Sequence, residues 1–282
     1  MHSIKSISTF YKGELASIYS SNEAKSITNL VLMHVLNYDK AQLILNEKEE
    51  LGNDTEKTLI DYLDQLKGGK PVQYVLGSTE FFGLNFKVNA SVLIPRLETE
   101  LLVQWILDDD PKANSSILDI GTGSGIIPIS FKHSLPSVSV SAMDISEGAL
   151  EVAKENARIN KVDVEFLLND ILEDKAIDSK YDVIVSNPPY VPIKDKESLH
   201  KNVKAFEPHL ALFVPNEDAL LFYNRISDYA MQALQRPGFL YFEIYEDYAN
   251  QIAEMLGQKG FQEIEIKKDL ADKDRMIRAK LV

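Results

Sequence analysis

Apolar side chains recur with a helical period over the first part of the chain, up to about residue 67. Residues 27–37 place apolar side chains three and four positions apart, with Leu30 and His34 on the predicted apolar face of a helix. Residues 54–67 repeat this pattern. Asp54 is a candidate N-cap for the second helix, and the glycine pair that follows predicts its end. Because no second metal-ligand candidate lies near His34, we interpret it as a helix-face residue.

The pattern changes at Pro71, where short apolar runs are separated by single glycine or asparagine residues. This pattern is typical of β-hairpins rather than helices. A helical period returns in residues 97–109. We therefore predict a helical domain at residues 1–70, a β-hairpin connector at residues 71–96 and a larger domain at residues 97–282.

Within the larger domain, apolar strands alternate with amphipathic helices. The predicted strands are residues 116–120, 137–145, 164–171, 181–186, 238–244, 261–269 and 275–282. This alternation predicts an α/β fold with a mainly parallel sheet that helices cover on both faces. No helix separates the last two strands, so we expect them to pair as an antiparallel hairpin at one edge of the sheet.

Composition removes several classes of protein. The chain has 282 residues and no cysteine, which excludes disulfides, thiolate metal sites and cysteine nucleophiles. The first twenty residues contain no continuous apolar block typical of a secretory signal, and no window approaches the roughly 20 apolar residues of a membrane span. We expect a cytoplasmic protein without membrane contact.

The formal net charge of −13 bears on the choice of partner. A protein that binds many phosphates carries a basic stripe, and dense basic clusters are small here. The charge therefore favours a basic partner or a small neutral substrate, and we expect no direct binding of nucleic acid.

The motif "LDIGTGSG" follows the first strand of the larger domain and contains Gly121, Gly123 and Gly125. Glycine lets the backbone turn tightly and approach a ligand that a Cβ atom would obstruct. A dinucleotide fingerprint requires glycine at its sixth position, where this chain has Ile126. No Lys-Ser or Lys-Thr pair follows the loop, which excludes a P-loop.

Acidic residues end the next two predicted strands. Asp144 can accept hydrogen bonds from both ribose hydroxyls of a nucleoside, and Asp170 can accept from an adenine amino group while Ile171 lies against the ring. With Asp119 just before the glycine loop, the pattern describes a nucleoside ligand without phosphates, and S-adenosylmethionine fits it. The predicted cofactor-binding residues are Gly121, Thr122, Gly123, Ser124, Gly125, Asp144, Asp170, Ile171 and Asn187. We predict no metal site.

The stretch "VIVSNPPYVP" ends a β-branched strand in a rigid polar corner, Asn187-Pro188-Pro189-Tyr190. Prolines cannot continue the strand, because they lack an N–H group and hold φ near −65°. With the glycine loop and the acids at the strand ends, this corner resembles that of class I methyltransferases that modify a planar nitrogen. The resemblance implies a Rossmann-like, seven-stranded mixed sheet.

The chemistry of such a nitrogen gives each corner residue a candidate role. An amide lone pair is delocalised, so the site must hold the –NH₂ group in line with the methyl donor. Asn187 can supply a side-chain oxygen as an acceptor, the carbonyl of Pro188 a second one, and Tyr190 a ring against the flat amide. We predict Asn187, Pro188 and Tyr190 as catalytic residues, and these three with Pro189 as substrate-binding residues.

Three longer segments resemble the HemK/PrmC family: "PVQYVLGSTEFFGLNFKVNASVLIPRLETE", "FEPHLAL" and "DLADKDRMI". The resemblance runs from about Tyr74 to the C-terminus. It implies an enzyme that methylates the glutamine amide in the Gly-Gly-Gln loop of peptide chain release factors. We expect a monomer in which the helical domain at residues 1–70 recognises the release factor. Leu97 stands where the family usually has proline, and Asp272 where it usually has glycine.

Other side chains have two interpretations each. Phe81 and Phe82 are candidates for a wall of the site or for the core. Arg96 and Glu98 can close over the methionine end of the cofactor or form a local salt bridge.

Alternative functions share the motifs. An enzyme that methylates the adenine amino group of DNA or RNA uses the same type of corner, but it must bind phosphates. A ribosomal-protein glutamine methyltransferase is a close sister. A non-catalytic cofactor-binding module is disfavoured by the intact Asn187 and Tyr190, and an NAD-dependent oxidoreductase by Ile126.

Overall fold

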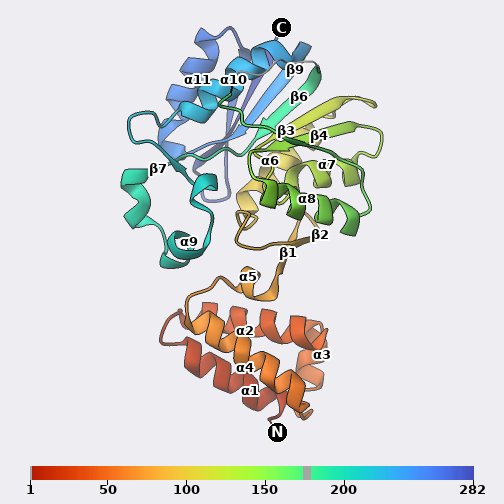
Figure 1. The fold of residues 1–282 in the computed structure, drawn as a ribbon, viewed down its shortest axis with the longest axis vertical. Coiled ribbons are helices and arrows are strands. Elements are labelled where there is room, and N and C mark those ends of the chain that lie inside the picture. The colour runs from red at the N-terminus through yellow and green to blue at the C-terminus, as the bar shows by residue number, and fades with distance from the viewer. Residues whose placement is uncertain (1, 174–178) are drawn as a thin grey trace. The chain divides into compact units, whose positions relative to one another are not determined.

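The helical and α/β parts of the chain form separate compact units in the computed structural model, which describes residues 2–173 and 179–282 (Figure 1). The first unit comprises Met1–Gly77 together with Lys201–Phe206. The second comprises Ser78–His200 and Glu207–Val282.

The α-helices are α1 (Ile4–Leu15), α2 (Ser21–Leu36), α3 (Lys40–Leu45), α4 (Asn53–Lys67), α5 (Val72–Leu76), α6 (Leu97–Asp108), α7 (Ile126–Ser134), α8 (Glu147–Ile159), α9 (Lys201–Phe206), α10 (Leu221–Ala233) and α11 (Ala249–Gln258). The strands are β1 (Ser78–Phe81), β2 (Leu84–Lys87), β3 (Ser116–Ile120), β4 (Ser139–Asp144), β5 (Glu165–Leu168), β6 (Tyr181–Ser186), β7 (Val191–Pro192), β8 (Phe213–Val214), β9 (Leu234–Glu243), β10 (Gln262–Lys268) and β11 (Asp274–Leu281). The 3₁₀-helices among the described residues are η1 (Ile193–Ser198), η2 (His209–Ala211) and η3 (Glu246–Tyr248).

The first unit buries one stripe from each of its longer helices. In α4, Leu59, Leu63 and Leu66 are buried as their spacing predicts. The expected N-cap is wrong, because Gly52 occupies that position and Asp54 lies in the first turn. A carboxylate there still interacts favourably with the helix dipole.

Helix α2 packs through a narrower face than its sequence indicates. Ala24, Ile27 and Val31 are buried, whereas Leu30 is 46% exposed. His34 is exposed as well. Successive helical residues turn by about 100°, so the buried residues of α2 occupy one side of the helix, and Leu30 points outside that side although it is three positions from Ile27.

The connector contains the predicted hairpin, and β1 pairs with β2 in antiparallel register. Phe82 and Gly83 between the strands both have positive φ, at 50° and 72°, the conformation of a tight hairpin turn. The hairpin prediction was wrong for Val72–Leu76, which forms α5. Pro71 begins this short helix and Gly77, with φ of 70°, ends it.

The second unit is built on a seven-stranded sheet in the order β10-β11-β9-β6-β3-β4-β5. Strands β9, β6, β3, β4 and β5 run parallel, and β11 pairs antiparallel with β9 and β10. The prediction of a mixed α/β sheet with an antiparallel hairpin at one edge is confirmed.

Alternate residues of the central strands pack into two hydrophobic cores, one on each face of the sheet. Leu118 and Ile184 pack with α10 and α11, whereas Ile117 and Val183 pack with α6 and α7 on the other face. Figure 1 shows these helices around the sheet. This double coverage explains why the strands read as continuous apolar runs.

The order in which successive strands are added to the sheet reverses at β3. Strands β4 and β5 follow on one side of it, and β6 and β9 lie on the other. Ligands of open α/β sheets bind beside the carboxyl ends of the strands at such a reversal. The glycine loop and the Asn-Pro-Pro-Tyr corner follow the two strands that meet there.

In the part of the chain that the structure describes, no helix combines the length and the apolar character that crossing a bilayer requires.

Replacing Ile184, which is fully buried in the central strand β6, should test the double core. Ile184→Ala leaves a cavity in a close-packed interior, so we expect the free energy of unfolding to fall by about 2 to 5 kcal/mol. Urea denaturation measures the change. Leu270→Ala, at a side chain that is 92% exposed, should change stability by less than about 0.5 kcal/mol. Equal effects of the two substitutions would contradict the packing.

Candidate active site

The glycine loop joins β3 to α7 through three left-handed residues. Gly121, Gly123 and Gly125 have φ of 74°, 54° and 81°. A Cβ atom at Gly121 or Gly123 would meet no atom within 4 Å, so backbone conformation alone requires glycine there. A Cβ atom at Gly125 would lie 3.1 Å from Cβ of Ala153 in α8, so close packing requires glycine as well.

Asp144, at the end of β4, holds this loop in place. Its Oδ2 accepts a hydrogen bond from the N–H of Gly123 at 2.8 Å, and its Oδ1 accepts from the N–H of Ser146 at 2.9 Å. Burial raises the pKa of Asp144, and these N–H donors oppose the shift. The sequence predicts Asp144 as a ligand-binding residue, and the structure shows that it also accepts a hydrogen bond from the backbone of the glycine loop.

Asp170 and Ile171 follow the end of β5. The Oδ1 atom of Asp170 accepts a hydrogen bond from the N–H of Leu172 at 2.8 Å, which closes a tight turn. Beside it, Oδ1 of Asn169 is buried without a hydrogen-bond partner in residues 2–173 and 179–282.

One cavity brings most of the predicted site residues together. Its walls include Gly121, Thr122, Gly123, Ser124, Asp144, Asp170, Ile171, Asn187, Pro188 and Pro189. Further walls come from the segment Ser91–Arg96, from Thr99 and from the segment around Leu210. The cavity is mostly apolar with a few polar groups at its edge, as small-molecule sites generally are.

The corner after β6 begins at a buried serine. The hydroxyl of Ser186 donates a hydrogen bond to the carbonyl of Ile120 at 2.6 Å, which ties the end of β6 to the end of β3. Asn187 follows, and its Nδ2 donates to the hydroxyl oxygen of Thr99 at 3.2 Å. Beyond the corner, Val191–Pro192 pairs with Phe213–Val214.

Tyr190 lies outside the cavity wall. Its hydroxyl donates to Oε1 of Glu243 at 3.2 Å, and its ring stacks on Tyr245 with centroids 5.8 Å apart. Burial and the nearby Glu243 carboxylate raise the pKa of the Tyr190 hydroxyl well above its usual value. Gly125 also lies outside the wall, because its role is packing against α8.

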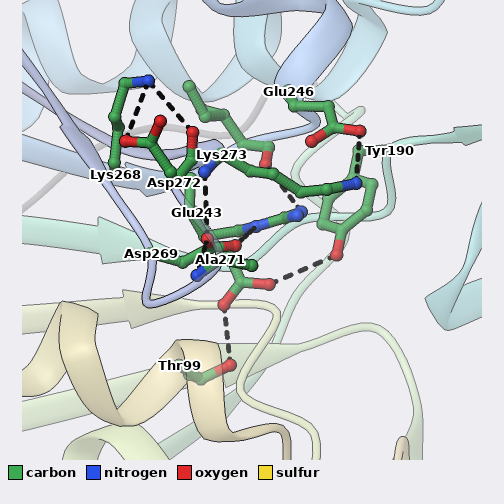
Figure 2. A network of polar contacts seen from close by, with 11 residues as sticks. Thr99, Tyr190, Glu243, Glu246, Lys268, Asp269, Ala271, Asp272 and Lys273 are labelled. Carbon is green, nitrogen blue, oxygen red and sulfur yellow. Dashed lines mark hydrogen bonds and ion pairs between the residues drawn. The ribbon is translucent and has the colours of Figure 1, made fainter.

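A buried glutamate, Glu243 in β9, lies at the centre of the polar contacts around the corner. Figure 2 shows it between Thr99 and Tyr190, and Oε2 of Glu243 accepts from the Thr99 hydroxyl at 2.7 Å. Burial raises the pKa of Glu243, while the Thr99 hydrogen bond and the charge of Arg275 lower it. Neither Thr99 nor Glu243 was predicted from the sequence as a site residue. A single charge inside the apolar run "FLYFEI" was the available signal for Glu243.

Arg96 forms a salt bridge, but its partner is the distant Glu207 and not a neighbour such as Glu98, so the local salt bridge expected from the sequence is wrong. Its guanidinium donates to both oxygens of the buried Glu207, at 2.8 and 2.9 Å, and the N–H of Ile94 donates to Glu207 at 3.2 Å. The bridge secures the wall segment Ser91–Arg96. Glu98 is half-buried and does not line the cavity.

The two phenylalanines of the hairpin belong to the core. Phe81 is 1% exposed, and Phe82 packs against the same cluster. Neither lines the cavity. Their sequence interpretation as core residues is confirmed.

Asp119 precedes the glycine loop but lies in the interior. It is fully buried and outside the cavity wall. Neither oxygen has a partner with full hydrogen-bond geometry in the described residues. Burial raises the pKa of Asp119 to about 7.

The cavity fits S-adenosylmethionine in its chemistry. The open space in front of Gly121 and Gly123 lets a ligand approach the backbone. Asp144 and Asp170 offer acceptors for hydroxyl and amino groups, and Ile171 with Pro188 offers apolar surface. In the described residues, no group of three or more His, Asp or Glu side chains has the arrangement of a metal site.

The fold and the site define a class I methyltransferase that uses S-adenosylmethionine. Residues 97–208 match the family model "Methyltransferase small domain". The catalytic domain of hMettl16, solved in complex with an RNA hairpin, has a similar fold, with a TM-score of 0.56 and 18% identity over 74% of this chain and 80% of that chain.

The particular family follows from closer relatives. Residues 10–77 match the model "PrmC N-terminal domain". The release factor glutamine methyltransferase of Flavobacterium psychrophilum is 43% identical, covering 98% of each chain. That of Bacteroides thetaiotaomicron is 38% identical, covering 97% of this chain and 98% of the relative. The chain belongs to the release factor glutamine methyltransferase family.

The buried Asp119 generates a pH prediction for the protein without cofactor. Its folded pKa of about 7 lies above the ordinary value of 3.8 for an aspartate, so the folded state holds the proton more tightly. Protonation of Asp119 contributes its full stabilisation of the folded state below pH 3.8, and this contribution is lost as pH rises through 7. Relative to Asp119→Asn, the parent should lose up to about 4 kcal/mol of unfolding free energy over this range. Urea denaturation at several pH values measures the difference.

The control is Asp163→Asn, at an exposed residue near β5. It should follow the pH dependence of the parent. A constant difference between the parent and Asp119→Asn from acid to neutral pH would show that Asp119 does not titrate in this range.

Proposed function

We propose that this protein transfers the methyl group of S-adenosylmethionine to the side-chain amide nitrogen of a glutamine in peptide chain release factors. The observation that carries the proposal is that the glycine loop and the Asn-Pro-Pro corner line one cavity, from the neighbouring strands β3 and β6. The names of the relatives support the substrate. The resemblance to their family supports the glutamine of the Gly-Gly-Gln loop as the target.

The residues that line the cavity would hold the cofactor in an extended arrangement. We propose that Asp144 accepts hydrogen bonds from the ribose hydroxyls and that Asp170 accepts from the adenine amino group, with Ile171 against the ring. Gly121 and Gly123 would allow close approach of the methionine part. S-adenosylmethionine supplies an electrophilic methyl group on its sulfonium.

The corner would hold the target amide. Its nitrogen is a weak nucleophile, because its lone pair is delocalised into the carbonyl group. Acceptors that hold the –NH₂ group in line with the methyl group favour the positive charge that develops on nitrogen. We propose that Oδ1 of Asn187 and the carbonyl of Pro188 are these acceptors. Proline fixes the direction of that carbonyl, since its φ is restricted. Pro189 would extend the rigid edge, and Tyr190 would support it.

The partner we propose is a protein, not a nucleic acid. A net charge of −13 opposes binding to a polyphosphate, and a release-factor loop needs no such contacts. We also propose that the enzyme acts as a monomer in the cytoplasm, where its substrate works.

We propose that the helical first unit, which we predicted at residues 1–70, docks the body of the release factor. On α3, Ile44 is 67% exposed and Leu45 is 81% exposed. Adjacent exposed apolar side chains on a short helix are typical of a protein contact.

The central test uses cofactor with a labelled methyl group. Incubation with release factor should place the label on the Gly-Gly-Gln glutamine, as peptide mass spectrometry would show. Asn187→Ala should lower kcat at saturating cofactor by about 100-fold or more, because it removes an oriented acceptor. Asn250→Ala, at an exposed residue of α11 in the second unit, is the matched control. Label on another residue, or on nucleic acid alone, would contradict the proposal.

The docking proposal predicts a separate effect. Replacing Ile44 and Leu45 together by serine should raise KM for whole release factor by about 10-fold, since hot-spot side chains carry most of the affinity of an interface. Calorimetric affinity for the cofactor and turnover of a short Gly-Gly-Gln peptide should stay unchanged. An unchanged KM for the whole protein would refute a role of α3 in docking.

A further inference from the structure

Glu243 is a buried charge that the proposed chemistry does not yet use. It is 1% exposed at the end of β9 and does not line the cavity. The register of the sheet pairs its neighbour Phe242 with Ser186. Glu243 therefore lies one residue beyond that pair, at the level where the corner begins.

The carboxylate of Glu243 accepts hydrogen bonds from two hydroxyl groups. Oε2 accepts from Thr99 at 2.7 Å, and Oε1 accepts from Tyr190 at 3.2 Å (Figure 2). The charge of Arg275 opposes the cost of burial, and Arg275 is itself paired with Asp269 at 3.1 Å. A buried carboxylate is tolerated when its oxygens are hydrogen-bonded and a cation is near.

The direction of the hydrogen bond from Thr99 to Glu243 determines the direction of the hydrogen bond between Thr99 and Asn187. An ionised carboxylate only accepts hydrogen bonds, so the single hydroxyl proton of Thr99 is directed at Glu243. The lone pairs of that hydroxyl then require a donor on its other side. Asn187 provides it through Nδ2 at 3.2 Å. A carboxamide that directs Nδ2 at Thr99 must direct Oδ1 elsewhere, and Asn187 lines the cavity.

We propose that Glu243 is a positioning residue that, through Thr99, fixes the rotation of the Asn187 side-chain amide so that Oδ1 is presented to the target amide. The inference rests on the proposed function, because that function makes Oδ1 the acceptor. With the opposite rotation, Asn187 would present its own –NH₂ group to the –NH₂ group of the substrate, and two donors cannot bond. The two rotations have nearly the same shape, so packing alone does not separate them.

The same carboxylate connects both ends of the corner. Asn187 reaches it through Thr99, and Tyr190 reaches it directly. The prolines between them restrict the backbone, whereas Glu243 orients the side chains. Three elements distant in sequence, α6, β9 and the corner, thus converge on one group.

The first test removes the hydroxyl link and leaves its shape. Thr99→Val should lower kcat for release-factor methylation by about 10- to 100-fold, because misorientation of one positioned group costs rates of this order. KM for release factor and the affinity for cofactor should stay within about twofold of the parent. Thr99→Ser, which keeps the hydroxyl, should restore most of the rate. Equal losses in the valine and serine variants would overturn the proposal.

The second test asks whether Glu243 acts through Thr99. A glutamine at this position can still accept the Tyr190 hydroxyl through its side-chain oxygen, but it also carries a donor group, so Glu243→Gln no longer dictates the direction of the Thr99 proton. It should lower kcat several-fold in the parent and have no further effect in the Thr99→Val background, a double-mutant cycle with full coupling. An effect of the same size in both backgrounds, or no effect in the parent, would overturn the role of Glu243.

A third measurement does not depend on catalysis. The side-chain amide protons of Asn187, observed by ¹⁵N NMR, should exchange with solvent faster in Thr99→Val than in the parent or Thr99→Ser. Unchanged exchange in Thr99→Val would refute the positioning bond. If the parent fails to methylate release factor while the exchange rates change as expected, the proposed function fails and the positioning bond stands.

Discussion

The hydrogen bond from the Ser186 hydroxyl to the carbonyl of Ile120 is the contact on which the arrangement of the site depends. It joins the ends of β6 and β3, the neighbouring parallel strands at the point where the strand order reverses. Each strand leads directly into one half of the site, the glycine loop or the Asn-Pro-Pro-Tyr corner. A shift of one residue in this pairing would invert the side chains of a strand and separate the two halves.

Around this junction, carboxylates removed from solvent hold the other parts of the site in place. Asp144 holds the glycine loop by the N–H of Gly123, Glu207 holds the wall segment through Arg96, and Glu243 accepts hydrogen bonds from the hydroxyls of Thr99 and Tyr190. Asp119 differs, because it is fully buried and burial raises its pKa to about 7. Charges removed from water are costly unless they are hydrogen-bonded, so the bonded carboxylates resist rearrangement and keep their partners in one orientation.

The sequence allowed the architecture and much of the cavity to be predicted. Continuous β-branched runs indicate strands that are buried on both faces, and the glycines and acids at their ends face a common edge of the sheet. The prediction was wrong where local signals compete. Val72–Leu76 has the apolar texture of a strand, but Pro71 and Gly77 limit it to a short helix. Asp54 has the chemistry of an N-cap but lies in the first turn of α4.

The amino-acid order alone determined where the strands of the sheet lie and which glycines, prolines and acids follow them, because periodicity and backbone restrictions act over a few neighbouring positions. Tertiary structure decided which of those ends meet and what each side chain contacts there. Tyr190 was expected against the substrate but has its hydroxyl on Glu243. Thr99 and Glu243, 144 positions apart, showed no common signal in the chain. Hydrogen bonds between distant segments depend on how helices and strands pack in three dimensions, and no local pattern encodes that packing.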